Sequence, residues 1–107
     1  MTKVVVEAGI CGFSIAVEVV RLSTRKVRVS VASECDMVRE MNSQLEELDW
    51  QDALRQLGDS PVYKSACQHI KHPACPIPVA IVKAIEVEVG VALPRDVVFR
   101  FETTNHR

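Results

Sequence analysis

The sequence predicts a two-layer α+β domain, in which helices cover one face of a four-stranded, mainly antiparallel sheet, in the order βββαααβ. Three observations lead to this prediction. Apolar residues alternate with polar ones in the first third of the chain, recur at three- and four-residue steps in the middle, and alternate again over 97–102. Strands and helices that are segregated along a chain are typical of α+β folds. The 107 residues are enough for a single domain over 1–107.

Three strands are expected before residue 33. The segment 3–8 is rich in β-branched residues, and two glycines in the following Gly9-Ile10-Cys11-Gly12 predict a tight turn. A second strand is expected over 13–22, and a turn at 23–25 leads into 27–31, where every second residue is valine. These segments predict an antiparallel meander, which the strand 97–102 then rejoins.

The alternation assigns side chains to the two faces of this sheet. The face beneath the helices is expected to carry Val4, Val6, Ile15, Val17, Val29, Phe99 and Phe101. The other face is expected to carry Val5, Glu7, Ala16, Glu18, Val20, Arg28, Ser30, Val98, Arg100 and Glu102. Four members of the second set are apolar, which makes this open face a candidate homodimer surface. Plain exposure to water is the alternative.

The helical segments follow the change of period. Ser33, with an acid three residues later, fits an N-cap, and a helix is predicted from there to Gly58. Its apolar positions are Val38, Met41, Leu45, Leu48, Trp50, Leu54 and Leu57. A second helix is predicted with Ser60 as N-cap and Pro61 at its first position. Three prolines within 72–78 predict an ordered bend. The segment 79–89 fits a strand or a helix, and its length and stop signals favour a buried helix.

Charge argues against two classes of partner. Thirteen basic and fourteen acidic residues give a net charge of −1, which provides no general attraction to nucleic acid or to an anionic membrane. The most basic stretch, 21–28, has no aromatic residue to stack on a base. No uncharged stretch approaches the roughly 20 residues that span a bilayer. The first residues enter a strand pattern without a signal-peptide pattern, so we expect a cytoplasmic protein with reduced thiols.

The four cysteines are the candidate site. Cys11, Cys35, Cys67 and Cys75 are separated by 23, 31 and 7 residues, which is not the close spacing of zinc ribbons or ferredoxin loops. Their expected positions are more informative. Cys11 falls in a glycine turn, Cys35 near a helix start and Cys75 in the proline bend, where metal ligands and reactive thiols occur. Cys67 lies on the expected apolar face of its helix. We predict that all four converge at one end of the sheet and bind zinc or an iron–sulfur cluster.

Three alternatives to this site remain open. In the first, Cys67 and Cys75 form a thiol redox pair. In the second, the cysteines are incidental, and the chain is a non-enzymatic module that binds or assembles with a protein partner. A zinc set of Cys67, His69, His72 and Cys75 is weaker, because residues two apart on a helix point about 200° apart. No histidine or acid lies in a recognisable acid–base arrangement, so no catalytic residue is assigned and a non-enzymatic role is favoured.

Several stretches together resemble a family of small uncharacterised domains. They are Glu7-Ala8-Gly9-Ile10-Cys11-Gly12-Phe13, Ser60-Pro61-Val62-Tyr63 through His72-Pro73-Ala74-Cys75-Pro76-Ile77-Pro78, Ala84-Ile85-Glu86-Val87 and Ala92-Leu93-Pro94-Arg95-Asp96-Val97. The family consists of cysteine-containing domains of about 100 residues, met mainly in anaerobic bacteria and archaea, so the resemblance would cover nearly the whole chain. It implies a domain of unknown function and no reaction. An anaerobic setting would favour iron–sulfur over zinc.

Overall fold

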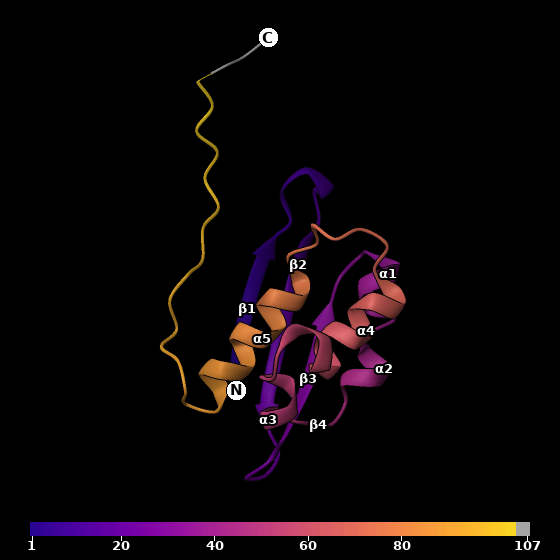
Figure 1. Cartoon of the computed structure of the whole chain (residues 1–107), viewed down its shortest axis with the longest axis vertical. Coiled ribbons are helices and arrows are strands. Elements are labelled where there is room, and N and C mark those ends of the chain that lie inside the picture. The colour runs from indigo at the N-terminus through magenta and orange to yellow at the C-terminus, as the bar shows by residue number, and fades with distance from the viewer. Residues whose placement is uncertain (105–107) are drawn as a thin grey trace.

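Four antiparallel strands form one sheet in the order β1-β2-β3-β4. The computed structural model describes residues 1–104, except for the side chain of Cys11. In chain order the elements are β1 (Thr2–Glu7), the 3-10 turn η1 (Gly9–Cys11), β2 (Ser14–Arg21), β3 (Lys26–Ala32), α1 (Asp36–Arg39), α2 (Asn42–Leu45), β4 (Leu48–Asp49), α3 (Trp50–Ala53), the 3-10 turn η2 (Leu57–Asp59), α4 (Pro61–His69) and α5 (Ile77–Glu88). The α+β class and the antiparallel meander are confirmed (Figure 1).

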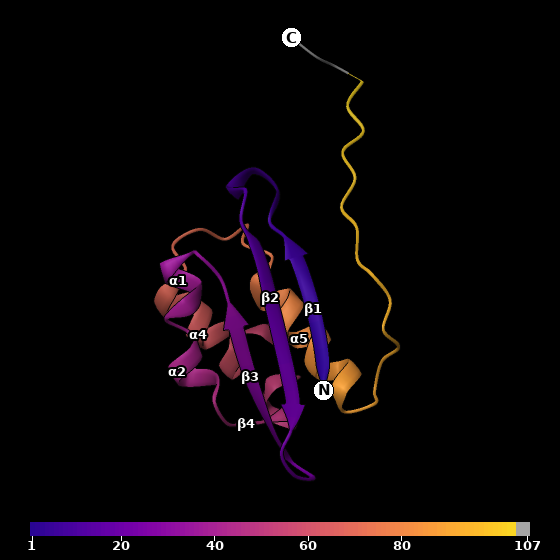
Figure 2. The ribbon, with the colours of Figure 1, turned by 180° about the vertical axis from the view of Figure 1, so that it is seen from behind.

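The helices lie on one side of the sheet and leave the other side uncovered. The strands lie behind the helices in Figure 1 and in front of them in Figure 2, where no helix crosses β1, β2 or β3. The long helix α5 packs against β1 and β2, while the short α2 packs against β3. The molecule therefore has two layers, with its core between them.

Strand register explains which side chains fill this core. Val4 lies opposite Val17, and Val17 lies opposite Val31. Because side chains alternate between faces, every second residue of each strand points toward the helices. The fully or nearly fully buried strand residues are Ile15, Val17, Val19, Val27, Val29 and Val31. The predicted inner positions on β1, β2 and β3 are thus confirmed, and the predicted outer residues Val5 and Val20 are exposed.

The fourth strand is not the predicted one. Residues 97–102 pair with no strand, and Phe99 and Phe101, expected beneath the helices, are exposed. The sheet is completed instead by β4, where Leu48 pairs with Val27 and Asp49 with Lys26. The alternating pattern at 97–102 does produce an extended chain, but this chain stands apart from the sheet (Figure 1).

The prediction of one continuous helix over 33–58 is also wrong. Its apolar positions Val38, Met41, Leu45 and Leu48 are buried as expected, but the segment is divided into α1, α2, β4, α3 and η2. The helix stops because Leu48 and Asp49 become extended and join the sheet. The first N-cap is Cys35, whose N–H donates to the Ser33 hydroxyl at 2.9 Å.

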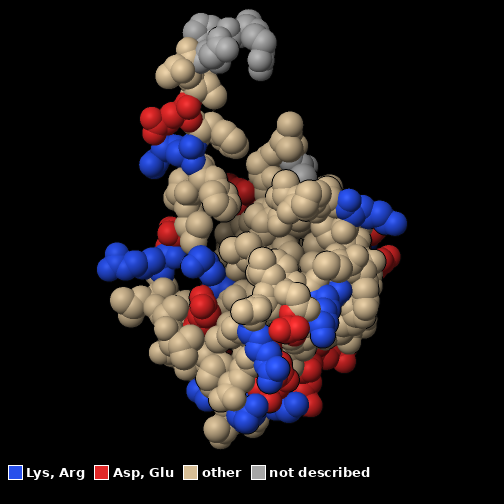
Figure 3. Space-filling view, in the orientation of Figure 1, with Lys and Arg blue, Asp and Glu red and all other residues tan. Residues whose placement is uncertain are grey.

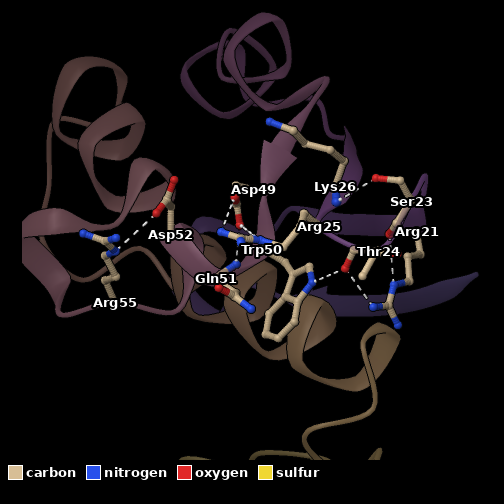
Figure 4. Close-up of polar contacts among 10 residues, drawn as sticks. All are labelled: Arg21, Ser23, Thr24, Arg25, Lys26, Asp49, Trp50, Gln51, Asp52 and Arg55. Carbon is tan, nitrogen blue, oxygen red and sulfur yellow. Dashed lines mark hydrogen bonds and ion pairs between the residues drawn. The ribbon is translucent and has the colours of Figure 1, made fainter.

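Contacts with the β2–β3 turn hold the chain at this break (Figure 4). The carboxylate of Asp49 accepts from Arg25 at 3.3 and 2.7 Å and from the N–H of Gln51 at 2.9 Å, which caps α3. The ring N–H of Trp50 donates to the carbonyl of Thr24 at 2.9 Å. Desolvation would raise the pKa of Asp49, but the hydrogen bonds from Arg25 and from the Gln51 N–H outweigh it and hold this pKa below its ordinary value. Arg25, a basic residue of this turn, therefore stabilises the fold.

The predictions for the last two helices are largely confirmed. Pro61 opens α4, and Ile77–Glu88 forms the predicted buried helix α5. Ser60 occupies the N-cap position, but its buried hydroxyl donates to the carbonyl of Ala53 at 2.7 Å and makes no capping bond. The side chain predicted as a cap thus ties α4 to α3.

Candidate functional site

Three of the cysteine-bearing segments lie at one end of the sheet. In Figures 1 and 2 the turn between β1 and β2, the start of α1 and the loop that enters α5 all lie toward the same end. These segments contain Cys11, Cys35 and Cys75 respectively. Cys35 and Cys75 are half-buried and pack against the core. The side chain of Cys11 lies outside what the structure describes.

Cys67 does not occupy the expected core position. Its side chain is exposed on α4, while Val62, Ser65 and Ala66 are the buried residues of that helix. A shift of one residue turns a helix face by about 100°. The hydroxyl of Ser65 donates to Gln44 of α2 at 2.5 Å, which is consistent with the turned face. The exposed Cys67 thiol is free.

No metal centre is formed by the side chains that the structure describes. Within residues 1–104, and without the Cys11 side chain, no three His, Cys, Asp or Glu residues gather in a group that could hold a metal ion. His69 contacts the carbonyl of Ser65 at 3.0 Å, and His72 is exposed. Cys35, Cys67 and Cys75 therefore form no metal-binding group of their own among the described residues, and a site containing all four cysteines stays a prediction.

A second candidate site, missed from the sequence, is the segment 91–104, which we name the C-terminal arm. It leaves the end of α5 and stands clear of the body of the protein (Figures 1 and 3). Among described residues, 96–104 make no backbone hydrogen bond. Phe99 is 76% exposed and Phe101 92% exposed. The sequence signal for this segment is the alternation at 97–102, which predicts a strand but does not show which sheet it joins.

The base of the arm is a well-formed helix end. Gly90, with φ of 84°, follows α5, and its N–H donates to the carbonyl of Val87. The N–H of Val91 donates to the carbonyl of Glu86 at 2.9 Å. This pair of bonds is the Schellman motif, and the left-handed conformation that it requires favours glycine. The chain therefore turns away from α5 at a fixed point.

Glu88 fastens the same helix end to the sheet. Its carboxylate accepts from the Thr2 hydroxyl at 2.7 Å and from the Arg21 N–H at 3.0 Å. Burial would raise the pKa of Glu88, but the hydrogen bonds from Thr2 and Arg21 outweigh burial and hold this pKa below its ordinary value. The arm thus begins from a point fixed to both β1 and β2.

The two edges of the sheet differ in how they are closed. At β3, Lys26 and Val27 pair with β4. Farther along β3, the side-chain amide of Asn42 accepts from the Val31 N–H at 2.8 Å and donates to the Val31 carbonyl at 2.9 Å. The other edge strand, β1, pairs with β2 alone. A sheet edge with unpaired backbone groups is a template for another strand.

A comparison with protein families places the chain among its relatives. The model of a Family of unknown function (DUF6951) matches residues 2–101. The chain belongs to this family. The DUF6951 match includes the sheet, all of the described helices and residues 91–101 of the arm. No curated protein and no solved structure gives a significant match.

The described part of this DUF6951 chain contains no helix that is both long and apolar enough to cross a membrane.

Proposed function

We propose that this chain is a non-catalytic assembly module that joins copies of itself through the C-terminal arm. The observation that carries the proposal is the exposure of Phe99 and Phe101 on an extended segment whose large apolar side chains are all at least half exposed. Two of the three phenylalanines of the chain are on this arm. Burying a phenylalanine side chain contributes about 1.5–3 kcal/mol, so a partner that covers both gains substantial binding energy.

The shape of the arm supports assembly. The molecule measures 53 × 29 × 24 Å, and in both ribbon views the arm extends along its longest dimension. Arg100 and Glu102 alternate with the apolar residues of the arm, as in a strand with one buried and one wet face. Such a segment gains little by covering a flat surface and much by pairing with a sheet.

Sedimentation velocity tests this proposal over a wide range of protein concentrations. The full chain is expected to associate beyond its 11.9 kDa monomer. The double variant Phe99→Glu/Phe101→Glu is expected to remain monomeric with an unchanged circular dichroism spectrum, because these side chains support nothing in their own domain.

A matched control carries the same two added charges at other exposed arm positions, Thr103→Glu/Thr104→Glu, and should associate like the full chain. A full chain that stays monomeric at every concentration would contradict the proposal. Association of the phenylalanine variant as tight as that of the control would also contradict it.

A second candidate function is metal or iron–sulfur binding through Cys11, Cys35, Cys67 and Cys75. Its support is that the segments of Cys11, Cys35 and Cys75 lie toward one end of the sheet. A site with four thiolate ligands and no open position would be structural or would transfer electrons. Zinc and iron–sulfur clusters both suit such ligands.

Anaerobic purification tests this second candidate, with measurement of zinc, iron, acid-labile sulfide and visible absorbance. Near-stoichiometric metal in the full chain, reduced in Cys11→Ser and in Cys75→Ser, would support it. Exposed Ser43→Ala is a control that should keep the metal. A metal-free full chain would contradict this candidate. Rapid alkylation of one thiol under mildly acidic conditions would instead support the thiol redox alternative.

A further inference from the structure

We propose that the C-terminal arm of one copy adds to the sheet of a second copy as an antiparallel strand beside β1. In this register Phe101 lies opposite Val4, and Phe99 lies opposite Val6. The inference rests on the proposed self-assembly and identifies the surface that accepts the arm.

The acceptor is the outer edge of β1. The N–H of Ala8 donates to the carbonyl of Phe13 at 3.1 Å, just beyond the end of β1. Because backbone bonds of an antiparallel pair alternate along a strand, the even residues of β1 bond to β2. The backbone groups of Lys3, Val5 and Glu7 then face outward. β3 offers no equivalent edge, since β4 and the Asn42 amide occupy it.

The inner face of β1 is incompletely covered. Val17, in the middle of the sheet, is fully buried, whereas Val4 and Val6 on the same face are only half-buried. α5 packs against β1, and in the described chain β1 pairs with no strand other than β2. A strand added at the outer edge of β1 would place Phe99 and Phe101 beside Val4 and Val6 and extend the apolar layer.

Charges on the open face suit the same register. With Phe101 opposite Val4, Glu102 lies opposite Lys3, and Arg100 lies opposite Val5. Lys3 already lies opposite Glu18 of β2, so its ammonium group would stand between two carboxylates. Directly opposed charges of unlike sign stabilise a strand pair. Arg100 would stand diagonal to Glu7 on one side and to Lys3 on the other, so the favourable charge pair of this register is Glu102 with Lys3.

The direction of the arm favours a second copy as its partner. In both ribbon views the arm begins near the first residues of β1 and runs in the same direction as β1. An arm that keeps this direction meets its own β1 only in parallel. The antiparallel register is reached by the arm of another copy, and reciprocal exchange of two arms gives a closed dimer with two-fold symmetry.

Val5→Pro tests the edge directly. Proline removes the outward N–H of Val5 that the arm needs, and an edge strand tolerates proline where its N–H faces away from the sheet. The variant is expected to weaken association by more than about tenfold, and Val5→Thr, which keeps the N–H, should associate like the full chain. An arm-dependent dimer that survives Val5→Pro would overturn the inference, while the proposed function would stand.

Carbodiimide cross-linking decides the register even if Val5→Pro fails to fold. A mixture of isotope-labelled and unlabelled chains is expected to give a Lys3–Glu102 link between copies, which Lys3→Arg abolishes because a guanidinium does not react. A dimer without this link would overturn the register, and a link found only within single chains would show that the arm folds onto its own sheet. The proposed function itself fails if the full chain stays monomeric, or if the phenylalanine variant associates as tightly as the full chain.

Discussion

Replacing Ile81 with alanine should lower the free energy of unfolding by about 2–5 kcal/mol. Ile81 is fully buried in the middle of α5, where this helix packs against β1 and β2. The truncated side chain would leave a cavity between the two layers, because helix and sheet are both held by other contacts. Urea unfolding at neutral pH measures the change. The loss is a large part of the roughly 5–15 kcal/mol that stabilises a typical domain.

Val79→Ala is the matched control for Ile81→Ala. Val79 lies on the same helix but is 40% exposed, so its truncation should change the stability by no more than about 1 kcal/mol. Equal losses for the two variants would mean that α5 does not pack in the way described.

Replacing Asn42 with alanine should cost about 1–3 kcal/mol. The variant removes both partners of the Val31 backbone, whose N–H and carbonyl bond to the Asn42 amide. Val31 is itself nearly fully buried, so water replaces these bonds poorly. Faster hydrogen exchange at the Val31 amide, together with urea unfolding, measures the effect. The stability of Asn42→Asp should fall between those of the unsubstituted chain and Asn42→Ala. Its carboxylate still accepts from the Val31 N–H but cannot donate to the Val31 carbonyl.

The neighbouring Ser43→Ala is the control for Asn42. Its hydroxyl reaches only the Glu40 carbonyl, at 3.5 Å and on the exposed side, so its loss should change little. The Asn42 variants also bear on assembly, because they reopen the second sheet edge. If that edge then accepts an arm, Asn42→Ala should form species larger than the full chain does.

The local parts of the fold were predictable from sequence. Period-two patterns identify the faces of β1, β2 and β3, because a strand with one buried face has an apolar residue at every second position. The division of 33–58 was not predictable, because it depends on Arg25 and Thr24 meeting Asp49 and Trp50, about 25 residues later in the chain. The helical period of the apolar residues gives no sign of such distant contacts.

The candidate sites were predictable only in part. Sequence places Cys11, Cys35 and Cys75 at a turn, a helix start and a bend, and the structure agrees on these local settings. The buried face of α4 is turned by one residue from the predicted Cys67 face, which is enough to move the Cys67 side chain from core to solvent. The strand pattern at 97–102 was read correctly as extended, but a pattern within one chain does not show which sheet receives it.

The Schellman turn at Gly90 also separates what folds from what protrudes. Every buried core residue that the structure describes precedes it, while Arg95 and Arg100 are exposed beyond it. Trypsin would therefore cut the arm and leave an intact, folded remainder. In a cell, proteolytic cleavage at this point would remove the C-terminal arm permanently without unfolding the rest of the domain.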